Sequence, residues 1–395
     1  MHAKPKLVYV VSEDWYFVSH RIALAVAAKE AGYDVTVITQ VNRHDDAIRD
    51  AGLALEPLAF NRSSLNPVSD AKTLGRLTAL YRRLAPSVVH HVAIKPVLYG
   101  SLAARRAGVP GVVNALMGLG YVFTSGDVKA RVLKPLVRTA LKAALSHRNS
   151  RVIVQNADDE QMLCTEHLAE RSTIRLIRGS GVDLTAFPFS VPPAGRPRVV
   201  LPARMLRDKG VVEFVDAARI LKSEGIDAEF VLAGSPDLVN PSSLTDAEIS
   251  GWVREGLVTY LGWREDMTAV LTSATVVCLP SYREGLPKVL LEAAACGRAI
   301  VTTDVPGCRD VVQDGVNGWL VPPRDAKALA DAVRAALTRD DLRARYAHAS
   351  RQLVEREHAI DAVIGATLAV YTEVLGSVTG AQGRSSHKKA GVDRR

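Results

Sequence analysis

A repeated alternation of short apolar runs with helical segments most constrains the fold of this chain. Each apolar run is rich in β-branched residues, and a helical pattern follows it. Strands and helices that alternate in this way form parallel sheets with helices on both faces. The runs that predict strands are Lys6–Val11, Asp34–Gln40, Ser87–Ala93, Gly111–Leu116, Arg151–Gln155, Arg198–Pro202, Ala228–Ala233, Val258–Gly262, Thr275–Pro280 and Ala299–Thr303.

The proline-rich stretch Phe187–Pro197 has no periodic pattern and divides the alternation into two series. We therefore expect an α/β protein with two doubly wound, Rossmann-like domains that face each other across a cleft. Ligands of such sheets bind beyond the carboxyl ends of the strands. The expected segments are an N-terminal domain (1–185), a linker (186–197), a C-terminal domain (198–358), a helix that packs back on the N-terminal domain (359–379) and a disordered basic tail (380–395).

The composition is that of a soluble globular protein, with 48% hydrophobic and 23% charged residues. No apolar run is long enough for a membrane span, and the charged N-terminus lacks a signal-peptide pattern, so a cytoplasmic location is expected. The four cysteines have no metal-like spacing and predict reduced thiols. Residues 1–185 have 24 Lys and Arg against 16 Asp and Glu, which favours an acidic partner for this half.

The stretch Ser281–Glu292 joins two of the predicted strands through a loop and a helix. Pro287 suits the first helical position, which places Glu284 and Gly285 at the helix N-terminus, where free amides favour anions. Glu292 lies among apolar residues, and a buried carboxylate needs partners. It predicts either an acceptor for ligand hydroxyls or a salt bridge to a structural arginine.

Two cations follow the first strand of the second series. Arg204 and Lys209 stand at a strand end that should meet the Glu284 loop, where they could bind a diphosphate. Each residue taken alone favours an ordinary surface cation, and it is their shared position at this edge that favours a diphosphate site. A nicotinamide dehydrogenase is disfavoured, because the loop Ser12–Val18 after the first strand contains no glycine.

Four segments of the second half resemble the donor domain of the retaining glycosyltransferases of family 4, which have the GT-B fold. They are Ala203–Gly210, Ser281–Glu292, Asp304–Gly307 and Asp314–Pro323. The resemblance implies that Arg204 and Lys209 bind the donor diphosphate, Glu292 the ribose and Glu284 the transferred sugar. It also implies that Gly285, Leu286, Pro287 and Lys288 meet the donor, partly through backbone groups. Glu284, Lys209 and Arg204 are the expected catalytic residues.

The first half resembles the branch of that family that extends lipid-linked sugars for capsule, O-antigen and glycoprotein glycans. The segments are Val11–Arg21, Arg62–Pro67, His90–Pro96, Gly118–Phe123 and Gly179–Asp183. Arg62, Lys95, Gly118 and Gly120 are the predicted acceptor-binding residues. Met117 departs from the pattern, because many members of the wider family have a histidine before this glycine-rich turn.

The expected reaction is a retaining, metal-independent transfer of a hexose or N-acetylhexosamine. No Asp-x-Asp pair follows a predicted strand, so cations and helix-end amides should replace a divalent ion. No cofactor is expected besides the nucleotide-sugar donor, which is expected to be UDP-linked. The resemblance implies that the leaving phosphate oxygen takes the acceptor's proton on the same face of the sugar.

A basic segment at 128–148 has leucines and valines at helical spacing and no acidic residue. It predicts either a helix on an anionic membrane, at the inner face of the plasma membrane, or a packed helix with a solvated cationic face. His90 and His91 are adjacent in a strand, so at least one is expected in the core.

The leading hypothesis is a glycosyltransferase of surface polysaccharide or glycan assembly that acts on a lipid-linked saccharide. A non-hydrolysing nucleotide-sugar epimerase, with the same two-domain architecture, is the enzymatic alternative. A non-catalytic basic surface that binds nucleic acid or membrane is the third. Nucleic acid is not an expected partner, because no aromatic residues interleave with the basic ones. Trp263 and Arg264, after a predicted strand, are weaker candidates for contact with the base.

Overall fold

The computed structural model describes residues 3–60, 67–117 and 128–389, and these form two compact units. Unit 1 comprises residues 1–177 and 364–395, and unit 2 comprises residues 178–363. The expected α/β class with two doubly wound parallel sheets is confirmed. The chain changes units at 177/178 and 363/364, whereas the sequence places its linker at 186–197.

Within the described residues, unit 1 contains a seven-stranded sheet in the order β3-β2-β1-β4-β5-β6-β7, and all pairs are parallel. Its strands are β1 (Lys6–Glu13), β2 (Asp34–Gln40), β3 (Ala54–Pro57), β4 (Val88–Val92), β5 (Gly111–Ala115), β6 (Ser150–Val154) and β7 (Ile174–Leu176). Its helices are α1 (Asp14–His20), α2 (Ile22–Glu30), α3 (Asp45–Asp50), α4 (Pro67–Leu84), α5 (Ile94–Ala107), α7 (Val128–Leu145), α8 (Ala157–Thr165) and most of α15 (Ile360–Lys389).

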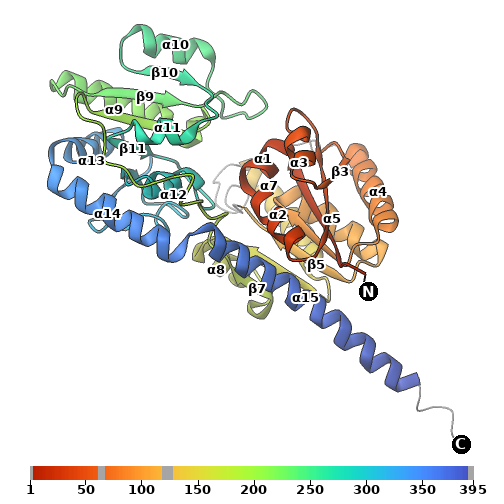
Figure 1. Cartoon of the computed structure of the whole chain (residues 1–395). Helices are drawn as coiled ribbons and strands as arrows, with labels where there is room; N and C mark the ends of the chain where they lie inside the picture. Colours follow the sequence, from red (N-terminus) through yellow and green to blue (C-terminus); the bar gives the residue numbers. More distant parts are fainter. Residues whose placement is uncertain (1–2, 61–66, 118–127, 390–395) are drawn as a thin grey trace, which may run out of the picture. The chain divides into compact units, whose positions relative to one another are not determined.

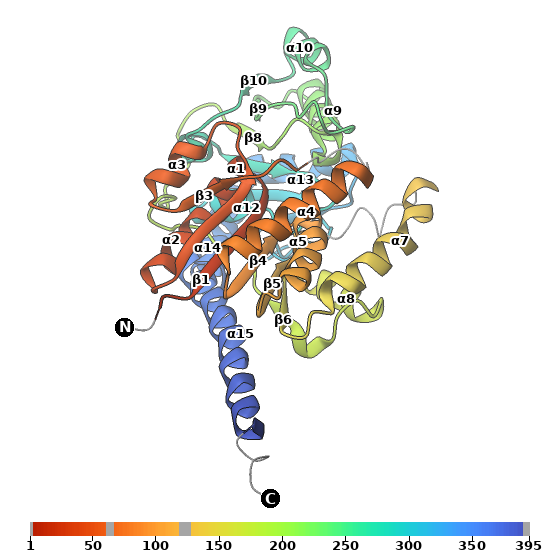
Figure 2. The same cartoon turned by 90° about the vertical axis from the view of Figure 1, so that its right-hand side faces the viewer.

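Alternate residues of the strands of unit 1 face two helical layers. Val8 and Val10 of β1 pack with α4 and α5, which lie side by side over the sheet (Figure 2). Between them in the sequence, Tyr9 points to the other face, where its hydroxyl is 2.8 Å from the hydroxyl of Tyr371 on α15. Glu373 on α15 forms ion pairs with Arg151 and Arg175, so this helix is tied to unit 1.

Helix α15 continues to Lys389, past the point at 380 from which the sequence predicts disorder. Extending a helix that is already packed adds a hydrogen bond per residue without a new nucleus, whereas low apolar content only disfavours an isolated segment. In the described part of the chain, α15 is also the helix that meets the length and hydropathy of a membrane span, over Ile360–Ser377. Tyr371 and Val374 are among the 28% of this stretch that is buried.

Unit 2 contains a six-stranded parallel sheet in the order β10-β9-β8-β11-β12-β13. Its strands are β8 (Arg198–Pro202), β9 (Glu229–Ala233), β10 (Thr259–Gly262), β11 (Val276–Leu279), β12 (Ala299–Thr303) and β13 (Trp319–Val321). Its helices, all labelled in Figure 1, are α9 (Val211–Ser223), α10 (Asp246–Arg254), α11 (Met267–Thr272), α12 (Lys288–Ala295), α13 (Ala326–Thr338) and α14 (Asp340–Glu357).

The helices of unit 2 also form two layers. Val199 and Leu201 of β8 pack with α9 and α13 on one face, and Val200 between them packs with α11 and α12 on the other. The strands β9, β8 and β11 are neighbours and run parallel, so the loops that follow them lie together at the carboxyl edge of the sheet. That edge is where the predicted donor residues lie.

Candidate active site

The connection from β11 to α12 is a loop followed by a helix, as predicted, and the helix begins one residue later than expected, after Pro287 instead of at it. Pro287 is the N-cap of α12, with φ −73° and ψ 107°, and the helix begins at Lys288. No side chain caps this end of α12 among the described residues, and the Leu290 N–H donates to the carbonyl oxygen of Pro287 over 3.0 Å, so the N–H groups of Lys288 and Val289 are the ones available to a ligand. Gly297, with φ 71°, follows the C-cap, as predicted.

Glu284 and Lys209 come together at the carboxyl edge of the sheet. Gly210 brings them close, because it has φ 70° and a Cβ at this position would lie 2.1 Å from the carbonyl oxygen of Pro280. Lys209 Nζ is therefore held 2.5 Å from Glu284 Oε1. The hydroxyl of Ser281 donates to the same oxygen over 2.6 Å. The structure thus unites two predicted site residues and adds a third that the sequence interpretation had not assigned a role.

Arg204 lies at the same edge but pairs with a different residue. Its Nη1 is 2.7 Å from Oδ2 of Asp237, which lies in the loop after β9. The Asp237 backbone N–H donates to the Ser243 hydroxyl over 3.0 Å, which fixes this loop locally. The sequence interpretation missed Asp237, since nothing in its local pattern distinguishes it from a surface aspartate. Arg204 is 39% exposed and is therefore open to a ligand on its outer side.

Glu292 is buried in the second turn of α12, with 6% of its surface exposed. Its carboxylate pairs with Lys288 one turn earlier, at 2.9 Å, rather than with the structural arginine that the sequence allowed. Burial raises the pKa of Glu292, and the Lys288 ammonium only partly opposes this effect. A carboxylate kept buried with one mobile cation suits an acceptor for ligand hydroxyls.

The turn Asp304–Gly307 packs against the backbone of the Glu284 loop. The Glu284 N–H donates to the carbonyl oxygen of Pro306 over 3.2 Å. Gly307 has φ 82°, and a Cβ there would lie 2.6 Å from the carbonyl oxygen of Gly285. Glycine is therefore required at 307, which explains why this segment accompanies the Glu284 motif.

Leu286 is a packing residue whose side chain is buried. A Cβ on Gly179 would lie 2.6 Å from its Cδ2, so the glycine segment Gly179–Asp183 rests on the Glu284 loop. This segment belongs to unit 2, although the sequence comparison grouped it with the first half. Any contact of Leu286 and Pro287 with a donor is left to their backbone groups, since both side chains are buried.

The predicted acceptor residues are only partly within the described chain. Arg62, Gly118 and Gly120 lie outside it. Lys95 lies in the first turn of α5, where burial lowers its pKa and the Asp70 carboxylate opposes the shift. The preceding N-cap, Ala93, has φ 78° and ψ 164°, a conformation that costs a non-glycine residue free energy.

His90 and His91 are both core residues, on opposite faces of the sheet. His90 Nδ1 is 2.6 Å from the hydroxyl of Tyr371, and His91 Nε2 is 2.9 Å from the hydroxyl of Tyr81. Burial lowers the pKa of each imidazole, that of His91 to about 4. Both histidines are therefore neutral structural groups at physiological pH. The guanidinium of Arg21 donates to Met117 Sδ at 3.3 Å beside them.

The basic helix α7 combines features of both expectations. Leu141, Ala144 and Leu145 are buried against unit 1, while Leu136 is 68% exposed. Arg138 is 3.6 Å from Glu166, and Lys142 is exposed. The side chains of Lys129, Arg131 and Lys134 are not described.

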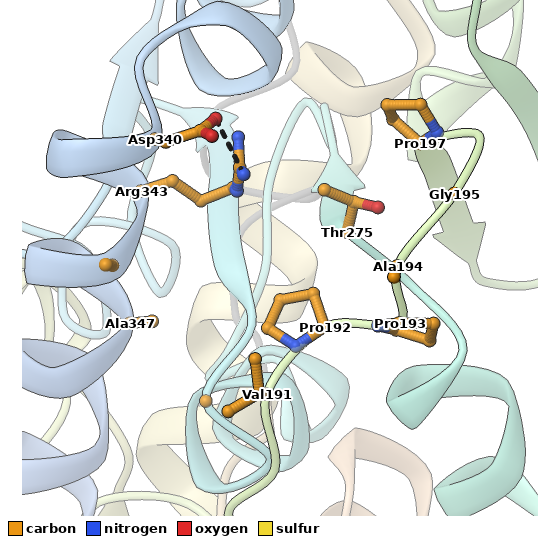
Figure 3. Close-up of a pocket in the computed structure, with 12 residues that line it drawn as sticks. Val191, Pro192, Pro193, Ala194, Gly195, Pro197, Thr275, Asp340, Arg343 and Ala347 are labelled. Atoms are coloured by element: carbon orange, nitrogen blue, oxygen red, sulfur yellow. Dashed lines mark ion pairs between the residues drawn. The ribbon is translucent and has the colours of Figure 1, made fainter.

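A cavity of about 420 Å³ lies elsewhere in unit 2, between the proline-rich stretch and α14 (Figure 3). Thr275 and Gly297, which line it, precede β11 and β12 and so mark the amino edge of the sheet. Arg343 at its wall is occupied by an ion pair with Asp340 at 2.8 Å. The cavity is therefore at the opposite edge from Glu284 and Lys209. Within the described residues, no group of three or more His, Cys, Asp or Glu side chains could share a metal ion.

Comparison with known proteins assigns the chain to a family. The model of glycosyl transferases group 1 matches residues 196–339, and that of glycosyl transferase 4-like proteins matches residues 6–156. The N,N'-diacetylbacillosaminyl-diphospho-undecaprenol alpha-1,3-N-acetylgalactosaminyltransferase of Campylobacter jejuni is 30% identical over 82% of this chain and 87% of its own length. The UDP-Gal:alpha-D-GlcNAc-diphosphoundecaprenol alpha-1,3-galactosyltransferase of Escherichia coli is 26% identical over 68% of this chain and 71% of its own.

Solved structures agree on the fold. Sucrose-phosphate synthase from Thermosynechococcus elongatus superposes with a TM-score of 0.78, at 21% identity, over 95% of this chain and all of its own. Anabaena HepE in complex with UDP and glucose gives a TM-score of 0.73 at 16% identity, over 93% of this chain and 99% of its own. The chain therefore belongs to the family 4 glycosyltransferases, which have the GT-B fold.

Proposed function

We propose that this glycosyltransferase moves a hexose or N-acetylhexosamine from a UDP-linked donor to a saccharide carried on a polyprenyl diphosphate, with retention of configuration and without a metal ion. The observation that best supports this is the group formed by Lys209, Glu284 and Ser281 at the carboxyl edge of the sheet of unit 2. The names of the Campylobacter and Escherichia relatives give the lipid-linked acceptor class and an α-linked product. The family supports a transferase rather than an epimerase.

In this proposal, unit 2 binds the donor. The diphosphate lies at the N-terminal end of α12, between Arg204 and Lys209, where free amides and two cations offset its charge. Glu292 accepts hydrogen bonds from the ribose hydroxyls, and Glu284 from a hydroxyl of the sugar. Lys209 exchanges the Glu284 carboxylate for the phosphate, whereas Arg204 meets the phosphate through its exposed side while it stays paired with Asp237.

The same groups assist the chemical step. When the bond from the anomeric carbon to the phosphate oxygen breaks, its electron pair stays on the leaving UDP, whose negative charge grows. Lys209 and Arg204 therefore bind the transition state more strongly than the ground state. The acceptor hydroxyl attacks the same face of the sugar and gives its proton to the departing phosphate oxygen.

Unit 1 is assigned the acceptor. Lys95 is a partly buried cation in the first turn of α5 and can meet the phosphates of a polyprenyl diphosphate. The basic helix α7, with Leu136 exposed, can place this unit on the anionic inner face of the plasma membrane. We expect the wild type to float with anionic vesicles and not with neutral ones, and we expect Leu136→Glu to bind the anionic vesicles less. Failure of the wild type to bind either kind of vesicle would contradict the membrane role.

The transfer itself is testable with purified enzyme. UDP-N-acetylgalactosamine, UDP-galactose, UDP-N-acetylglucosamine and UDP-glucose are each offered with an undecaprenyl-diphosphate-linked N-acetylhexosamine in excess EDTA. We expect acceptor-dependent UDP release with one donor, and NMR of the product should show an α linkage. Release that requires added Mg²⁺ or Mn²⁺ would contradict metal independence, a β linkage would contradict retention, and a new epimer without acceptor would favour the epimerase.

A further inference from the structure

One oxygen of Glu284 receives two hydrogen bonds, and the other receives none from the described residues. Oε1 accepts from Lys209 Nζ at 2.5 Å and from Ser281 Oγ at 2.6 Å. The side chain of Glu284 is 12% exposed, so its free oxygen Oε2 is the one available to a ligand. The two donors therefore set the direction in which Glu284 presents Oε2.

Ser281 is the more rigid of the two donors. It is fully buried and lies two residues beyond the end of β11, after Pro280. Its carbonyl oxygen accepts a hydrogen bond from the Thr303 hydroxyl, and the Thr302 hydroxyl donates to the carbonyl oxygen of Leu279 over 2.6 Å. Two side chains of β12 thus fix the backbone that carries the Ser281 hydroxyl. Lys209, by contrast, has a flexible stem and is 20% exposed.

The two donors also differ in charge. An entering diphosphate attracts the Lys209 ammonium strongly and competes with Glu284 for it, because both are anionic. The neutral Ser281 hydroxyl has no such attraction and sits where the backbone holds it. Once Lys209 turns to the phosphate, the hydroxyl is the remaining described hydrogen bond to Glu284 Oε1.

We propose that Ser281 is a positioning residue that keeps the Glu284 carboxylate aimed at the transferred sugar while Lys209 is engaged by the donor diphosphate. The inference rests on the proposed function, because it assigns Glu284 to the sugar. It predicts that Ser281 affects sugar transfer and leaves recognition of the nucleotide alone unchanged. A merely structural role would affect both.

The test compares Ser281→Ala with a matched hydroxyl deletion in the same unit, Ser273→Ala. Ser273 Oγ donates to the carbonyl oxygen of Val270 over 2.8 Å at the end of α11, away from the site. We expect Ser281→Ala to lower kcat about 10- to 100-fold, the effect of one hydrogen bond to a charged group. UDP affinity by calorimetry should stay within about twofold of wild type, and Ser273→Ala should resemble wild type in both measurements.

A double-mutant cycle shows whether Ser281 acts through Glu284. In a Glu284→Ala background, Ser281→Ala should lower the residual rate no further. An equal loss in both backgrounds, or a loss of UDP affinity as large as the loss of kcat, would overturn the inference. If the wild type transfers sugar and Ser281→Ala has the same kcat, this inference is overturned and the proposed function stands. A wild-type enzyme that transfers no sugar from any of the four donors would overturn the proposed function as well.

Discussion

Buried carboxylates occur at the carboxyl edges of both sheets, and the two edges use them in opposite ways. In unit 1, Asp14 follows β1 and accepts backbone N–H groups from Asn42, Arg43 and His44 at 2.6 to 3.0 Å. In unit 2, the partly buried Glu284 and the buried Glu292 pair, among the described residues, with side chains alone, chiefly the cations Lys209 and Lys288. A carboxylate held by fixed amides is structural, whereas one held by mobile ammonium groups can exchange its partner for a ligand.

The pKa directions express the same contrast. Burial alone would raise the pKa of Asp14, but the backbone N–H groups of Asn42, His44, Arg43 and Trp15 outweigh burial and lower it. Burial raises the pKa of Glu292, and Lys288 does not fully offset it. The charge on Asp14 therefore stabilises the fold at neutral pH, and the charge on Glu292 costs stability.

The largest expected effect is the loss of the cation beside Glu284. Lys209→Ala should lower kcat about 100- to 1,000-fold, because it removes a preorganised charge from the leaving diphosphate. The matched control is Lys222→Ala, at the far end of α9, since the partner of Lys222 Nζ within the described chain is the carbonyl oxygen of Gly256. Steady-state UDP release measures both variants. Turnover of Lys209→Ala within about threefold of the control would contradict the role of Lys209.

Removal of the buried carboxylate of unit 2 should affect binding rather than chemistry. Glu292→Ala deletes the proposed acceptor for the ribose hydroxyls, so UDP affinity should fall about 10- to 100-fold. Isothermal titration calorimetry with UDP measures this change, and Glu224→Ala, which removes an exposed glutamate paired with Arg334, is the control. Unaltered UDP affinity in Glu292→Ala would remove the ribose assignment.

The structural carboxylate of unit 1 should show a stability effect without a binding effect. Asp14→Asn places an amide where three backbone N–H groups converge, which should cost about 2–3 kcal/mol at pH 7.5. Since the folded pKa of Asp14 lies below its unfolded value, this cost should shrink as pH falls through the acidic range where the aspartate is protonated. Urea unfolding at several pH values, with exposed Asp50→Asn as control, gives the difference. A variant as stable as the control at neutral pH would disprove the role of Asp14.

The smallest expected effect is a gain in stability, whereas the preceding substitution in unit 1 should lower stability. Glu292→Gln should raise stability by about 1 kcal/mol near pH 8, which corresponds to roughly 2–4 °C in Tm for a unit of this size. The pKa of Glu292 is higher in the folded than in the unfolded protein. The ionised carboxylate therefore costs the wild type no stability below the usual glutamate pKa, and this cost develops as pH rises through the folded-state pKa. The gain should therefore vanish in acid. A loss of stability at pH 8 would show that the ion pair with Lys288 outweighs burial.

Within the described residues, the sequence predicts every central strand of the two sheets, and β10 among the edge strands. All ten predicted strands are present. The three that it missed, β3, β7 and β13, are edge strands. All three are short: Glu56 interrupts the apolar pattern of β3, Arg175 interrupts that of β7, and the apolar run of β13 is limited to Trp319–Val321. The loop expected after β1 is in fact helix α1, which begins at Asp14, whose carboxylate binds the chain 28 to 30 residues further on.

The site was predicted where a local motif encodes it. Glu284, Glu292 and Pro287 stand in one segment, and Lys209 was placed near them because strand topology brings its loop to the same edge. Asp237 and Ser281 were missed, since their roles depend on hydrogen bonds and ion pairs that spacing does not reveal. The roles of Arg204, Lys209, Glu284 and Glu292 toward a donor remain predictions.

Hydrogen–deuterium exchange, with the donor that supports turnover, tests the central claim most directly, because it shows where the nucleotide-sugar binds. We predict that saturating donor slows exchange in peptides covering 203–212 and 281–292 of unit 2, and that Glu292→Ala reduces this protection at the same donor concentration. Peptides that contain Asn42 and Arg43 in unit 1 should exchange at the same rate with and without donor, since the Asp14 carboxylate already accepts hydrogen bonds from their N–H groups. Saturating donor that protects neither 203–212 nor 281–292 would contradict the account.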